Sequence, residues 1–291
     1  QIWKVLLINV LLATLVTFTH GVLFSQKITL TAIPFTLIGL PLAIFLGFRN
    51  TAAYDRYWEA RKLWGELLLR CRNLSRQCQS LINLPQPVQP GAGRDDIRVR
   101  MVHRAIAFCH ALRQQLRGVP DRGEVQALLQ PPEWQALQRS GSQTTLLMHH
   151  MGLDLQHCLR SGYIGEPLAA SIDNTLSALV SAAASCERIK SSPLPFSYTL
   201  LLHRTAYMYC FLLPFGLVDT IGFMTPFVVG IVAYTFFGLD ALGDEIEEPF
   251  GLLPNDLPLD AICRTIEINL RESLGETDLP PPLQAVDYCL L

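Results

Sequence analysis

One stretch of the sequence, Ile28–Phe48, contains no formally charged side chain and is closed by Lys27 on one side and Arg49 on the other. A helix rises about 1.5 Å per residue, so roughly 20 apolar residues cross a hydrocarbon core of about 30 Å. An uncharged apolar stretch of this length, bounded by basic residues, predicts a transmembrane helix. This prediction excludes an ordinary soluble core for this part of the chain.

Three further stretches are apolar over a similar length. Ile2–Phe24 carries Lys4 as its only formal charge, and Tyr198–Val218 and Ile221–Leu239 are separated by Asp219–Thr220. A signal peptide is the alternative for the first stretch, but no small-residue cleavage pattern follows it and a second apolar stretch comes almost at once. The sequence therefore predicts an all-α integral membrane protein with four transmembrane helices.

Basic residues gather where the second apolar stretch ends and where the third begins. They are Arg49, Arg56, Arg61, Lys62, Arg70 and Arg72 in the first group and Arg188, Lys190, His203 and Arg204 in the second. Because basic flanks face the cytosol, both termini and the long middle segment are expected there. The expected organisation is residues 1–49 as transmembrane helices 1 and 2, 50–197 as a cytosolic domain, 198–239 as transmembrane helices 3 and 4, and 240–291 as a cytosolic acidic segment, short helix and extended tail.

The middle segment has a helical rather than a strand pattern. Apolar residues recur three, four and seven positions apart between Tyr57 and Leu81, and no proline occurs before Pro85, so the second transmembrane helix is expected to continue to about Asn83. Further helices are expected at Asp95–Leu116, Gln143–Leu159, Glu166–Ile189 and Leu257–Leu274, with Gly118–Gly123 and the Pro131–Pro132 pair as breaks.

Composition excludes several classes of function. With 23 Lys+Arg against 25 Asp+Glu and a formal net charge of −2, the chain lacks the basic field that a nucleic-acid binder needs. It contains no catalytic motif of the hydrolase, P-loop or dinucleotide-binding type, so it is not expected to be an enzyme. Its eight cysteines form no CxxC pair and its histidines match no ligand spacing, so no metal and no cofactor is expected.

The second apolar stretch places Leu40, Ile44 and Phe48 on one helical face. Within a single subunit this face is a packing stripe. Around an axis shared by several copies, the same side chains would stack over roughly 12 Å as an apolar constriction that gates by dewetting. The spacing leaves both interpretations open, and the next turns bring Asp55 and Glu59, either as carboxylates of a vestibule or as part of a solvated face.

The acidic run from Asp240 to Glu248 permits two interpretations as well. Asp240, Asp244 and Glu248 share a helical face, and oxygen-rich clusters suit calcium, yet no EF-hand spacing is present. The alternative is that these carboxylates pair with the many arginines of the cytosolic helices.

Several motifs, in their order along the chain, resemble those of bacterial bestrophins. They are Gly39–Asn50, Tyr54–Trp58, Ser185–Ile189, Pro193–Tyr198, His203–Arg204 and Glu247–Gly251. The resemblance implies a homopentamer in the bacterial inner membrane, with one central pathway. It implies a hydrophobic neck at Leu40, Ile44 and Phe48, and a cytosolic aperture at Leu168.

The resemblance also bears on the ion. Vertebrate bestrophins are calcium-activated anion channels with an acidic run where this chain has Leu252–Asp256, so the chain groups with bacterial relatives and calcium gating is not expected. The resemblance then implies conduction of monovalent cations, sodium or potassium, through the lipid bilayer. The alternatives are a chloride channel of the same architecture and a membrane-anchored scaffold that does not conduct.

Overall fold

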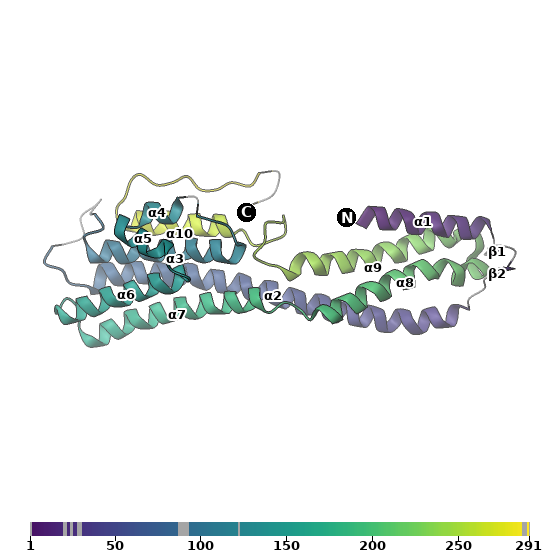
Figure 1. Cartoon of the computed structure of the whole chain (residues 1–291), viewed down its shortest axis with the longest axis horizontal. Coiled ribbons are helices and arrows are strands. Elements are labelled where there is room, and N and C mark those ends of the chain that lie inside the picture. The colour runs from purple at the N-terminus through teal and green to yellow at the C-terminus, as the bar shows by residue number, and fades with distance from the viewer. Residues whose placement is uncertain are drawn as a thin grey trace. The chain divides into compact units, whose positions relative to one another are not determined.

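The computed structural model of the chain describes residues 2–19, 22–23, 26–27, 31–86, 93–121, 123–286 and 290. The fold is helical, as the sequence predicts, apart from the short antiparallel pair β1 (Val22–Leu23) and β2 (Gln26–Lys27), in which Val22 pairs with Lys27 (Figure 1). The chain divides into two compact units, Gln1–Tyr57 with Pro193–Glu248 and Trp58–Ser192 with Pro249–Leu291. Each unit is described by itself below.

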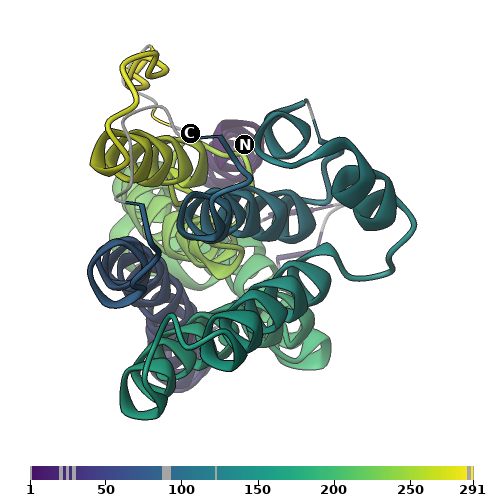
Figure 2. The same ribbon diagram turned by 90° about the vertical axis from the view of Figure 1, so that its left-hand side faces the viewer.

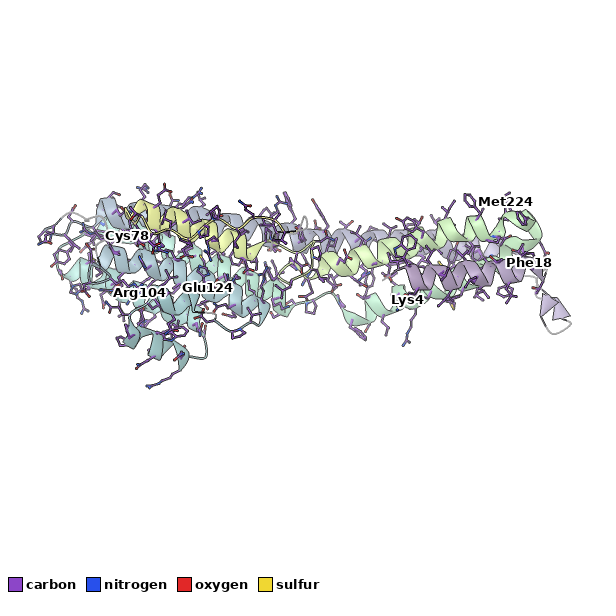
Figure 3. All side chains as sticks on the ribbon, turned by 90° about the horizontal axis from the view of Figure 1, so that it is seen from above. Lys4, Phe18, Cys78, Arg104, Glu124 and Met224 are labelled. Carbon is purple, nitrogen blue, oxygen red and sulfur yellow. The ribbon has the colours of Figure 1, made fainter. Side chains whose placement is uncertain are left out.

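The first unit is made of long apolar helices. It contains α1 (Ile2–Phe18), the first part of α2 (Ala32–Leu81), α8 (Phe196–Ile221), the 3₁₀ turn η1 (Gly222–Met224) and α9 (Thr225–Glu247). The helix α1 packs against α8 and α9, and its residue Phe18 lies at the same end of the unit as Met224 of η1 (Figure 3). Large apolar side chains point outward all round, and helices that are apolar on every side are typical of a membrane environment.

Close packing between α2 and α8 explains two glycines. A Cβ atom added at Gly39 would lie 2.8 Å from the hydroxyl of Tyr209, and one added at Gly216 would overlap the ring of Phe35. Phe35 itself is buried in a cluster with Ala13, Leu213 and Val229. Because membrane helices associate through packing rather than through the hydrophobic effect, such close approaches hold α2 against α8.

The second unit is a helical bundle built around α3 (Ile97–Arg117). Around it lie the remainder of α2, α4 (Glu124–Leu128), α5 (Pro131–Gln138), α6 (Gln143–Arg160), α7 (Glu166–Ser191) and α10 (Leu259–Ser273) (Figure 2). Nearly every residue of α3 is buried, arginines and histidines included. A buried helix with this many polar side chains requires partners from its neighbours, which determines the chemistry described below.

Most helices expected from the sequence are confirmed. The second apolar helix continues without a break to Leu81, close to the expected end at Asn83, and α6 and α7 begin at the predicted residues. The connection at Asp219–Thr220 was wrong, because α8 continues to Ile221 and ends at Gly222, whose φ of 53° only glycine adopts readily. His20, Phe24 and Ile28–Leu30, which belong to the expected first connection and first two spans, lie outside the described residues.

The break expected at Pro131–Pro132 lies two residues earlier, at Leu129–Gln130, between α4 and α5. Pro131 is the first residue of α5. A backbone N–H at this position would have no acceptor within the helix, and the fixed φ of proline is already close to the helical value.

A candidate ion-conduction surface

The part of α2 in the first unit has one buried face and one exposed face. Leu42 and Leu46 are 3% and 1% exposed, and Leu42 packs against Leu202 and Ala206 of α8. On the other face, the predicted neck residues Leu40, Ile44 and Phe48 are 66%, 48% and 63% exposed. The structure thus places the three side chains together on one face of α2, uncovered by the other described residues.

Two prolines interrupt the sequence of this helix with different effects. Pro34 lies in the first turn of α2, where the backbone N–H groups have no partner within the helix in any case. Pro41 lies in the interior and leaves the carbonyl of Leu37 without its usual partner. The helix nevertheless continues through it.

Gly47 lies beside the neck face. No atom of the described residues comes within 4 Å of a Cβ added at Gly47. In contrast to Gly39, its small size is therefore not required by packing among the described residues. A close approach at Gly47 would have to come from outside them.

Polar side chains follow the neck along α2. Asp55 is exposed, and no residue of the described chain forms an ion pair with it within 4.0 Å. Glu59, one turn later, accepts a hydrogen bond from Arg188 at 2.6 Å, with side chains that are 44% and 64% exposed. The structure therefore distinguishes the two predicted vestibule carboxylates, because Glu59 shares its charge with an arginine and Asp55 does not.

Arg49, directly after the neck, is buried in an ion-pair network. Its side chain is fully buried, and its Nη1 donates to Oδ1 of Asp240 at 3.0 Å and to the carbonyl oxygen of the same residue at 3.2 Å. Its Nη2 bonds to Asp244 and lies 3.6 Å from Oε2 of Glu247. On the other side of Asp240, Oδ2 lies 2.6 Å from Nδ1 of His203.

This network connects α2, α8 and α9 at one level of the first unit. At Asp240 and Asp244 it agrees with the interpretation in which the acidic run pairs with arginines. A Cβ added at Gly243 would overlap Asn50 and come within 3.0 Å of Nη1 of Arg49, so only glycine leaves space for the buried guanidinium. The positive charge next to the neck is consequently neutralised inside the unit.

Leu168, the predicted aperture residue, belongs to the second unit. It lies in the first turn of α7, where its N–H donates to the carbonyl of Gly165 at 3.1 Å, and its side chain is 42% exposed. An exposed apolar side chain at a helix start is compatible with a ring of such residues, and the aperture stays a prediction.

The sequence analysis did not predict the buried ion pairs and hydrogen bonds of the second unit. His103 of α3 lies 2.7 Å from Oε1 of Glu276, and burial lowers the pKa of this histidine below its usual value despite the carboxylate. Arg104 donates to Glu133 at 2.6 Å and to Asp154 at 2.5 Å. These partners are 29 to 173 residues apart in the sequence, so no local spacing indicates them.

Comparison with known proteins identifies the family. The bacterial and fungal bestrophin family matches residues 1–272. The chain belongs to the bestrophin family. A crystal structure of a bacterial bestrophin homologue from Klebsiella pneumoniae superposes on this bestrophin with a TM-score of 0.88 at 37% identity, over 95% of this chain and 100% of that one.

Two bacterial channel-forming proteins are also similar to this chain over most of their length. A voltage-dependent anion channel-forming protein of Mesorhizobium japonicum is 44% identical over 86% of this bestrophin and 77% of the relative. The voltage-dependent anion channel-forming protein YneE of Escherichia coli is 41% identical over 94% of this chain and 87% of the relative. A further crystal structure, described as that of a membrane protein, has a TM-score of 0.88 at 37% identity, over 96% of this chain and 100% of that one.

Proposed function

We propose that this bestrophin is an ion channel rather than an enzyme, and that the exposed face of α2 lines its conducting pathway. The observation that carries the proposal is the uncovered apolar face at Leu40, Ile44 and Phe48, on a helix whose opposite face is fully packed. In a homopentamer spanning the bacterial inner membrane four times per subunit, with both termini in the cytosol, these side chains form a hydrophobic neck. Such a neck raises the cost of dehydrating an ion without binding it.

The names of the curated relatives support anions, such as chloride, as the conducted ions, whereas the sequence analysis expected sodium. An apolar neck has no preference for either sign, so nearby fixed charges set the selectivity. The arginine next to the neck is buried against carboxylates and contributes little positive field. Cation conduction is the second candidate, favoured by the exposed and unpaired carboxylate of Asp55.

The reversal potential of the purified protein in planar bilayers decides between the two candidates. Under a tenfold sodium chloride gradient, a perfectly selective channel reverses at about 59 mV, with a sign set by the conducted ion. The proposal expects the chloride sign. A reversal potential with the sodium sign would support a channel but contradict the proposed anion selectivity. The absence of current at all voltages would favour the non-conducting scaffold.

The neck has its own test in a matched pair of variants. Ile44→Ala shortens an exposed side chain of the neck and should raise the single-channel conductance several-fold, because a wider apolar passage costs less to hydrate. Ile38→Ala is the control, with a side chain that is 41% exposed compared with 48% for Ile44 and that lies about 120° away around the helix. Equal conductance of the two variants would contradict the assignment of the neck.

A further inference from the structure

A polar cavity of about 220 Å³ lies within the second unit. Its charged lining comes from three helices: His110 and Arg113 with Arg117 from α3, Glu124 from α4, and Asp260 with Arg264 from α10. One of these residues, Glu124, is labelled in Figure 3. Because α3, α4 and α10 all contribute, the cavity is built by residues that are distant in the sequence.

The carboxylates of this lining are already engaged. Asp260 forms ion pairs with Arg113 and Arg117: its Oδ1 lies 2.9 Å from Nη1 of Arg113 and its Oδ2 lies 2.8 Å from Nη1 of Arg117. Glu124 binds the other terminal nitrogen of Arg113. These ion pairs hold the arginines in place and leave few acceptor positions inside the cavity.

In contrast, several N–H donors of the lining have no hydrogen-bond acceptor in the described part of the chain. Among the described residues, the Nε atoms of Arg113, Arg117 and Arg264 are buried and have no hydrogen-bond acceptor. His110 is 1% exposed, and neither of its ring nitrogens makes a hydrogen bond. Its nearest carboxylate oxygens, of Glu267 and Glu124, lie at 3.4 and 3.8 Å, beyond the ordinary range of 2.7–3.2 Å. Buried donors without acceptors are costly, and proteins normally supply them with a partner.

We propose that this cavity binds a small oxyanion, of the phosphate or carboxylate type. Three arginines and two carboxylates give the lining a charge of +1, and the unfilled groups are N–H donors that match oxygen acceptors. Glu267, adjacent to the cavity, pairs with Arg271 at 3.1 Å, and this arginine also pairs with Glu276 at 2.7 Å. The site is independent of the conduction pathway, because none of its residues belongs to the first unit.

Binding is measured by isothermal titration calorimetry of the full-length protein in detergent, with inorganic phosphate in one arm and acetate in the other. Saturable heat with either probe supports the site and identifies which oxyanion it prefers. Arg264→Gln should weaken the binding at least tenfold, because it removes a donor and a positive charge from the lining.

Arg70→Gln is the matched control. Arg70 also belongs to the second unit, is 36% exposed compared with 22% for Arg264, and pairs with Glu66 at 3.0 Å, but it does not line the cavity. It should retain the affinity of the unaltered protein. Arg264→Lys keeps the positive charge but removes the planar guanidinium, so it should give an affinity between those of the unaltered protein and Arg264→Gln. This graded effect distinguishes a binding defect from misfolding.

Two results would overturn the proposal. One is the absence of saturable binding of both phosphate and acetate to the unaltered protein. The other is equal affinity in Arg264→Gln and Arg70→Gln, which would leave the cluster as a purely structural ion-pair network.

Discussion

The buried guanidinium of Arg49 allows a quantitative test of how the first unit is held together. Arg49→Met keeps the length and apolar stem of the side chain but removes its charge. The substitution leaves Asp240, whose side chain is 5% exposed, without its main counter-charge, while Asp244 is 56% exposed and regains water. Asp240 also keeps His203 at 2.6 Å.

The magnitude follows from these burials. Removing one partner of a buried ion pair costs about 3–5 kcal/mol, because the remaining charge is uncompensated. Since His203 still faces Asp240 and Asp244 is solvated, the lower end, about 3 kcal/mol, applies here. An unfolding entropy of about 2.1 cal/mol/K per residue gives roughly 0.6 kcal/mol/K for a chain of 291 residues, and thus a fall in Tm of about 5 °C.

The assay is thermal denaturation of the detergent-solubilised protein, followed by size-exclusion fluorescence. Arg188→Met is the control, because it breaks a pair with Glu59 whose side chains are 64% and 44% exposed. An exposed pair contributes about 0–1 kcal/mol, so its Tm should change by no more than about 2 °C. The double variant Arg49→Met with Asp240→Asn should recover part of the loss, since it also removes the unpaired charge.

Equal shifts in the two single variants would refute this reasoning. In that case burial would not set the strength of the pair, and the network around Arg49 would have no special role in fixing α2 against α9.

Three shorter predictions concern the pathway and the second unit. Asp55→Asn should shift the reversal potential toward more anion-selective values in bilayers, since it removes an exposed negative charge. Leu168→Ala should change conductance or selectivity, whereas Val180→Ala on the same helix, at 46% exposure compared with 42%, should not. Acidification should destabilise the protein in two steps. Burial lowers the pKa of His103 below 6.5, so its contribution is complete above about pH 6.5 and is lost as the pH falls. Burial raises the pKa of Glu276, but hydrogen bonds from Arg271 and His103 outweigh it and hold the pKa below 4.5, so its contribution is lost below about pH 4.5. Tm measured between pH 8 and 4 checks both, and His103→Gln should flatten the first step.

The sequence determined the helices because their signals are local. Apolar length and the absence of proline between Tyr57 and Leu81 were sufficient to predict that α2 continues from the apolar stretch to Leu81. Ordered motifs were sufficient to indicate the bestrophin family, and a four-residue spacing was sufficient to place Leu40, Ile44 and Phe48 on one face. The ends of helices were less well predicted, as at Asp219–Thr220, because a single glycine in the left-handed region decides them.

Only the tertiary structure decided which charges are available. Arg49 and Asp55 look equally exposed in the sequence, yet one is buried against Asp240 and the other is unpaired. The same holds for the cavity around His110, whose charged side chains come from three helices. Ion pairs and donor balance depend on contacts between residues far apart in the chain, and periodicity within one helix contains no information about them.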